Sequence, residues 1–128
     1  MLPSASFEPR QATWQPLTSL ADLEQAKNLS QQHPIVIFKH STECPVSASA
    51  LRRLEQGWLQ DEENSKITIF YLDLLRYRNL SNLIADDFEV KHESPQILVI
   101  TEGRAAAHLS HHQISYPALQ EAIQNLSA

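Results

Sequence analysis

The chain has 128 residues, a length that suits one domain, and its 42% hydrophobic and 20% charged residues are ordinary for a globular protein. Its net charge of -5 at pH 7 argues against nucleic acid or an anionic membrane as a partner. Two glycines cannot assemble a dinucleotide-binding fingerprint or a P-loop, and one cysteine excludes both an intrachain disulfide and an all-cysteine metal site.

The first 40 residues predict an arm, a helix and a buried strand. Residues 1–13 lack periodicity, which indicates a loose arm or a short edge strand. Residues 19–31 predict an amphipathic helix that Thr18 or Ser19 would cap. One stripe along its surface consists of Leu20, Leu23, Lys27 and Ser30. Residues 35–38 are continuously apolar, which is typical of a strand buried on both faces.

A second helix is predicted directly after the segment that contains the cysteine. Pro45 suits the first position of a helix. Apolar side chains then recur at a spacing of four residues: Val46, Ala50, Leu54 and Trp58. The polar residues 61–65 predict the turn that follows this helix.

The middle of the chain predicts a strand and a short helix. Residues 67–72 form an apolar strand pattern that ends at Asp73. Asn79 or Ser81 would cap the next helix, whose expected buried side chains are Leu80, Leu83, Ile84 and Phe88.

The last third predicts a hairpin and a closing helix. Residues 96–101 and 105–109 pair around Gly103, which supplies a positive φ, and Ser115 would cap the final helix. Strands that alternate with helices imply right-handed crossovers and a parallel core, to which the hairpin adds an antiparallel edge. The sequence therefore predicts one α/β domain over residues 14–128, with a mixed sheet of four to five strands flanked by helices.

The single cysteine occupies the most informative position. Cys44 immediately precedes the helix that starts at Pro45, so its sulfur would lie among amide groups that lack intrahelical acceptors. Such a position favours the thiolate, which is the nucleophilic form. Ser47 lies one turn further on, where its hydroxyl could donate a hydrogen bond to the sulfur. The alternative is an inert thiol, because free cysteines usually behave as small hydrophobes.

A second informative segment precedes the hairpin. Pro95 follows Ser94 directly before the predicted strand. A trans proline would be a rigid entry to that strand, whereas a cis proline beside the sulfur would leave the preceding backbone free to pair with an extended substrate. His92 lies in the same loop and is a candidate neighbour of the site.

These features together resemble a known family. The order of features resembles the thioredoxin fold: a strand is followed by a Cys-Pro-x-Ser motif at a helix start, and a Ser-Pro dipeptide comes later, before a hairpin. The longer phrases are more specific, namely IFKHST at 37–42, CPVS at 44–47 and VKHESPQ at 90–96. With them, residues 14 to 126 resemble the monothiol bacilliredoxin family, the YtxJ-type proteins of the bacillithiol system.

The resemblance implies a thiol-disulfide oxidoreductase that removes bacillithiol from S-bacillithiolated protein cysteines. Cys44 would be the nucleophile, and Ser47 stands where a dithiol enzyme has its second cysteine, so no internal thiol can resolve the mixed disulfide. The partners would be S-thiolated client proteins and a low-molecular-weight thiol, with bacillithiol as co-substrate and no bound cofactor. The expected substrate-binding residues are Thr42, Pro45, Ser94, Pro95 and His92.

Two other functions stay open. One is a thioredoxin-like adaptor, and the other is an iron–sulfur carrier in the manner of monothiol glutaredoxins. Such carriers usually have Gly-Phe where this chain has Pro45 and Val46. Phe38 replaces the buried aspartate that dithiol thioredoxins carry six positions before the nucleophile, which disfavours a general dithiol reductase. The six histidines predict no metal site.

The location expected from the sequence is the cytoplasm. The chain shows no secretory signal, and its apolar runs are too short to span a bilayer. A lone thiol can stay free in that reducing compartment.

Overall fold

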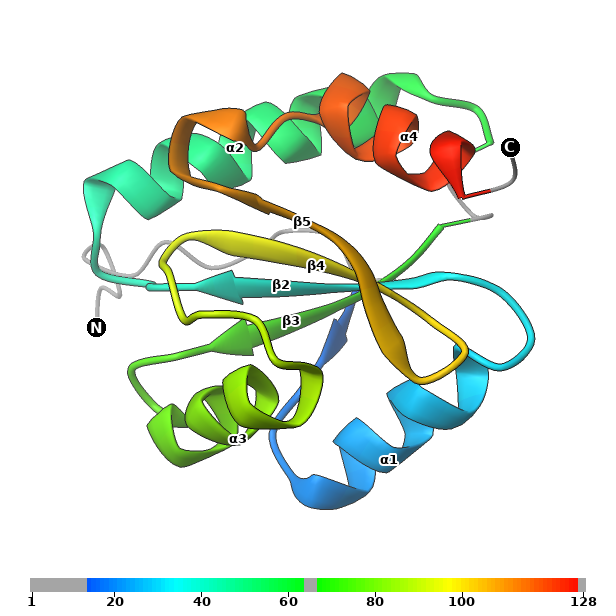
Figure 1. Cartoon of the computed structure of the whole chain (residues 1–128). Helices are drawn as coiled ribbons and strands as arrows, with labels where there is room; N and C mark the ends of the chain where they lie inside the picture. The colour runs from blue at the N-terminus through cyan, green and yellow to red at the C-terminus, as the bar shows by residue number, and fades with distance from the viewer. Residues whose placement is uncertain (1–13, 64–66, 127–128) are drawn as a thin grey trace.

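The computed structural model describes residues 14–63 and 67–126, and the predicted arm over residues 1–13 lies outside these ranges (Figure 1). A short 3₁₀ helix, His111–Gln113, follows the last strand. In chain order the other elements are β1 (Gln15–Pro16), α1 (Leu20–Leu29), β2 (Ile35–His40), α2 (Pro45–Gln60), β3 (Thr68–Asp73), α3 (Arg78–Phe88), β4 (Gln96–Thr101), β5 (Arg104–Ser110) and α4 (Tyr116–Asn125).

The five strands form one mixed sheet in the order β1-β3-β2-β4-β5. β1, β3 and β2 are parallel, whereas β4 and β5 are antiparallel to their neighbours. Helices α2 and α4 cover one face, and α1 and α3 cover the other (Figure 1). This arrangement confirms the predicted α/β architecture. The short edge strand β1, at Gln15–Pro16, follows the predicted arm.

Alternation along β2 separates two hydrophobic cores. Val36 and Phe38 belong to the core on the α2 side, and Ile35 and Ile37 belong to the core on the α1 side. The strand continues to His40, two residues beyond the predicted end, so its last two residues also lie within the sheet.

The segments that follow β2 and β3 and the loop that precedes β4 lie at the same edge of the sheet. His40 at the end of β2 is in register with Asp73 at the end of β3, so the segments after both strands leave from the same edge. β4 runs the opposite way, and Gln96 at its start pairs with Lys39. The loop that precedes β4 therefore reaches this edge too.

The predicted caps are confirmed for two helices and wrong for a third. Ser19 caps α1 by accepting the amide of Asp22 at 3.1 Å, and Ser115 caps α4 in the same way. α3 begins at Arg78 without a side-chain cap, which is two residues earlier than a cap at Asn79 predicts and four earlier than a cap at Ser81 predicts, so both residues lie inside the helix. Ser81 is buried and takes part in tertiary contacts instead.

Three leucine or valine side chains expected in the core are exposed. Leu20 is 63% exposed, Val46 is 52% exposed and Leu83 is 39% exposed. Leu20 and Val46 lie in the first turns of α1 and α2, and Leu20 and Leu83 line a surface pocket. The hairpin prediction is confirmed at Gly103, which has a φ of 74°.

Gly57 makes the close contact between α2 and α4 possible. A Cβ at this position would lie 2.3 Å from the Cβ of Tyr116, which is the root of a buried side chain and cannot move away easily. We expect Gly57→Ala to lower the free energy of unfolding by about 2 kcal/mol, because overpacking of about 3 kcal/mol exceeds the gain of about 1 kcal/mol in helix propensity. Urea unfolding would measure this loss. Gln56→Ala, at an exposed position of the same helix, serves as the control, and equal stability of both variants would contradict the prediction.

Candidate active site

Cys44 is the residue that precedes the first turn of α2. Its backbone is extended, with φ -106° and ψ 122°, and its carbonyl accepts the amide of Ala48 at 2.9 Å. Its own amide donates to the carbonyl of Ser41 at 3.3 Å, which closes the loop between β2 and α2. The side chain makes no capping hydrogen bond and is partly exposed. The thiol therefore stands at the helix start, where a disulfide-containing substrate can reach it.

Ser47 holds the loop rather than the sulfur. Its hydroxyl is fully buried, accepts the amide of Ser41 at 3.1 Å and lies 2.7 Å from Nδ1 of His40. Among the hydrogen bonds of the described residues, none joins this hydroxyl to Cys44, so the predicted contact is wrong. The side chain lies on the inward face of the first helical turn, where a buried hydroxyl must be paired.

Thr42 links the cysteine loop to the loop after β3. Its buried side chain donates from Oγ1 to Oδ2 of Asp73 at 3.5 Å. The other carboxylate oxygen of Asp73 accepts the amides of Leu75 at 3.2 Å and Arg76 at 3.4 Å. Asp73 therefore connects the two loops, and a role of Thr42 in substrate binding stays a prediction.

The loop before β4 reaches the same edge with a cis proline. The Ser94–Pro95 peptide bond is cis. Pro95 is buried and its carbonyl accepts the amide of His111 at 3.0 Å, while Ser94 is half-buried. Because Gln96 pairs with Lys39 near the end of β2, this loop lies at the edge from which the cysteine loop departs.

His92 belongs to a buried cluster beneath α3. The fully buried Lys39 donates from Nζ to the carbonyl of Ser81 at 3.1 Å and lies 3.4 Å from Nδ1 of His92. Burial lowers the pKa of Lys39 to about 8. Burial, followed by the charges of Lys39 and Arg78, also lowers the pKa of His92, and Glu93 partly opposes that shift. The contacts of His92 are thus on the α3 side of the sheet, opposite α2.

Pro45 is exposed and borders a recess beside the nucleophile. The recess has a volume of about 260 Å³ and is lined by Pro45, Val46, Ser49, Arg53 and His112. The guanidinium of Arg53 donates to the carbonyls of Ile114 at 3.0 Å and His111 at 3.3 Å, so it anchors the segment after β5 to α2. The apolar part of this recess consists of Pro45 and Val46, the two residues that directly follow the nucleophile.

The contacts of three residues at this edge were not evident from the sequence. Lys39 and His40 precede the cysteine loop, which suggests only that they add positive potential near the thiol, and Asp73 looks like a strand-end or loop residue. The period of two along β2 was the available signal, since it places Lys39 on one face and His40 on the other. Nothing in the local pattern indicates the contact between Asp73 and Thr42.

The described residues hold neither a metal-binding cluster nor a membrane-spanning helix. Over 14–63 and 67–126, no group of three histidine, cysteine, aspartate or glutamate side chains is arranged to hold a metal ion. Within the same ranges, none of the helices has the length and apolar character needed to cross a membrane. The contact of His111 with a carboxylate joins only two residues, since Nδ1 of His111 lies 3.5 Å from Oε1 of Glu93 in the loop that precedes β4.

The family follows from a match over most of the chain. Residues 15–119 match the sequence profile described as monothiol bacilliredoxin BrxC, and this span contains the cysteine loop, the cis proline and the whole sheet. The chain belongs to the monothiol bacilliredoxin BrxC family. The resemblance noted from the three phrases is thereby confirmed.

Solved structures place this bacilliredoxin in the thioredoxin fold. One, described as a candidate oxidoreductase with a thioredoxin fold, has a TM-score of 0.73 and 29% identity, and the match covers 88% of this chain and 95% of that one. Thioredoxin from Malassezia sympodialis has a TM-score of 0.69 at 16% identity, with 94% and 96% covered. Thioredoxin from Fasciola hepatica has a TM-score of 0.65 at 19% identity, with 87% and 97% covered. Family and fold together support a thiol oxidoreductase.

Proposed function

We propose that this bacilliredoxin removes bacillithiol from S-bacillithiolated protein cysteines in the cytoplasm. The observation that carries the proposal is the partly exposed thiol of Cys44 at the start of α2, in a chain with no second cysteine. Position 47 holds a buried serine that is used to fix the loop, so the reaction must proceed through a mixed disulfide with another molecule. The proposal involves no bound cofactor.

The exchange has two steps, and each conserves the number of disulfides. The Cys44 thiolate attacks the bacillithiol sulfur of the client mixed disulfide, the client sulfur leaves as a thiolate and takes up a proton, and Cys44 becomes S-bacillithiolated. A second molecule of low-molecular-weight thiol then attacks that bacillithiol sulfur and releases the Cys44 thiolate. The products are a reduced client and a disulfide of the two small thiols.

The test offers the reduced protein a model protein that carries one S-bacillithiolated cysteine, and follows both by intact mass. We expect the adduct to move from the client to Cys44, and we expect Cys44→Ser to abolish the transfer. The matched control is the double variant Cys44→Ser/Ser49→Cys, which keeps one thiol at an exposed position of α2 but moves it away from the helix start. Transfer to that variant at the wild-type rate would refute a role for the position of Cys44.

The same measurement distinguishes the alternatives for the small thiol and for the function. Clients modified with glutathione or coenzyme A show which thiol is removed fastest. If the client keeps every adduct and Cys44 gains none, the proposed function is wrong. Absorbance after reconstitution with iron and sulfide would then test the iron–sulfur carrier.

A further inference from the structure

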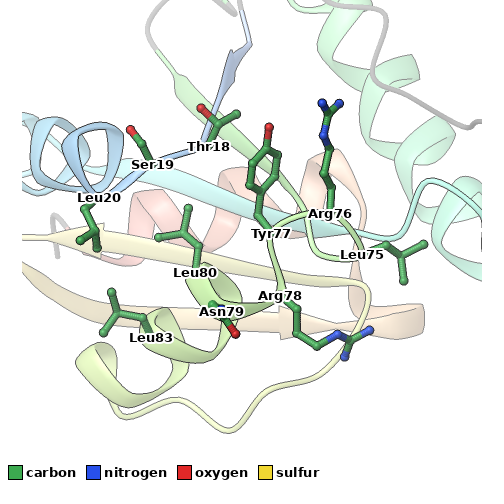
Figure 2. A pocket seen from close by; sticks show the side chains of 10 residues that line it. All are labelled: Thr18, Ser19, Leu20, Leu75, Arg76, Tyr77, Arg78, Asn79, Leu80 and Leu83. Atoms are coloured by element: carbon green, nitrogen blue, oxygen red, sulfur yellow. The ribbon is translucent and has the colours of Figure 1, made fainter.

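A second surface feature lies on the other face of the sheet from α2. A pocket of about 640 Å³ opens between the first turns of α1 and α3 (Figure 2). Its apolar part consists of Leu20, Leu80 and Leu83, which gather on one side of Tyr77, and Leu75 extends from the opposite side. Of these, Leu20, Leu75 and Leu83 are 63%, 42% and 39% exposed, which is a concentration of exposed leucines that folding does not require.

The rim of this pocket is positively charged in a chain whose net charge is -5. Arg76 and Arg78 both line it and both are exposed, and neither forms an ion pair among the described residues. The guanidinium of Arg76 lies 5.7 Å from the centre of the Tyr77 ring. Because α3 starts here without a side-chain cap, its first amide groups add to the positive potential.

A second hollow adjoins this pocket on the side of the sheet edge that carries Cys44. A smaller hollow of about 200 Å³ shares Thr18, Arg76 and Tyr77 with it and extends to Asp73. Asp73 in turn accepts the hydrogen bond from Thr42, two residues before the nucleophile. A chain that passes from the leucines over Asp73 would therefore approach the loop that carries Cys44.

We propose that this pocket docks an acidic, leucine-containing segment of the client protein. Apolar side chains of the segment fill the leucine floor, and its carboxylates pair with Arg76 and Arg78. A small, highly polar thiol would leave the leucines uncovered, which is why we assign the pocket to the polypeptide part of the mixed disulfide. The identity of the partner as a client rests on the proposed function, whereas the binding itself does not.

Binding is tested on the Cys44→Ser protein, so that it is independent of disulfide exchange. The probe is a peptide with two adjacent leucines between two pairs of aspartates, and its counterpart has lysines in place of the aspartates. In NMR titrations of ¹⁵N-labelled protein, we expect the acidic peptide to shift the amides of Leu20, Leu75 and Leu83. We expect the lysine peptide to bind at least fivefold more weakly.

Charge-reversed variants make the test specific. Arg76→Glu combined with Arg78→Glu should weaken binding of the acidic peptide at least fivefold. Arg104→Glu, on the β4–β5 hairpin at the opposite edge of the sheet, should leave it unchanged. The proposal is overturned if the peptide causes no shifts, if the shifts centre elsewhere, or if both peptides bind equally. If the protein with Cys44 intact fails to remove the adduct while the Cys44→Ser protein still binds the acidic peptide, the proposed function is wrong and the docking site stands.

Discussion

Ser47→Ala is expected to lower the free energy of unfolding by about 2 to 4 kcal/mol and to slow disulfide exchange at Cys44 at least tenfold. The substitution removes a buried acceptor from the Ser41 amide and a 2.7 Å contact from His40. A buried donor left unsatisfied costs about 1–3 kcal/mol, and the lost contact adds about 1 kcal/mol. The loop that carries the thiol then loses its attachment to α2, and a misplaced nucleophile reacts more slowly.

Urea unfolding and the rate of adduct transfer to Cys44 measure the two effects of Ser47→Ala. Ser49→Ala is the matched control, because it removes a hydroxyl from an exposed position on the same helix. We expect it to leave the transfer rate unchanged and to alter stability by less than about 0.5 kcal/mol. Wild-type stability and rate in Ser47→Ala would show that the buried hydroxyl does not position the loop.

Stability is expected to increase by about 2 kcal/mol between pH 7.5 and pH 9.5 because of Lys39. Burial lowers the pKa of this lysine from 10.5 in the unfolded chain to about 8 in the folded protein. Between these two values the unfolded chain binds the proton that the folded protein has lost, so a rise in pH favours folding. Below pH 8 the buried charge is present and its desolvation penalty is largest.

Lys39→Met separates this effect from other titrations. Methionine is uncharged and of similar length, so we expect the stability of the variant to change little over the same pH range. Both proteins should carry Cys44→Ser, which removes ionisation of the thiol from the comparison. The range ends at pH 9.5 because two other groups affect stability at higher pH. Burial raises the pKa of Tyr116, and Asp87 raises the pKa of Lys27. The protonated form of each residue therefore stabilises the folded protein, and this stabilisation is lost as the pH rises further. A parallel rise in Lys39→Met would show that Lys39 is not its source.

The buried Lys39 is connected to the candidate active site through the contacts of its ammonium group. Its ammonium group joins the carbonyl of Ser81 in α3 to His92 in the loop before β4. That loop continues to Pro95 at the edge from which the cysteine loop departs. The lysine therefore ties β2, α3 and the proline loop together at the expense of burying a charge.

Local residue patterns were enough to predict the helices and strands and to place the nucleophile at a helix start. Apolar runs of strand length, helix spacing and Gly103 in the turn gave an α/β domain with an antiparallel hairpin, because these signals are local. Pro45 at the first helical position fixed Cys44 at the start of α2 for the same reason. The phrases around Cys44 and Pro95 were sufficient to indicate the family.

The side chains that meet around that nucleophile could not be predicted in this way, because their contacts join distant parts of the chain. The pattern assigns a residue to a face of a strand or helix, but it does not identify a partner that lies far away in the chain. Ser47 bonds to His40 instead of the sulfur because β2 continues two residues past its apolar run, held by its pairing with β3 and β4. The same extension buries Lys39 beneath α3, and this burial lowers the pKa of the lysine.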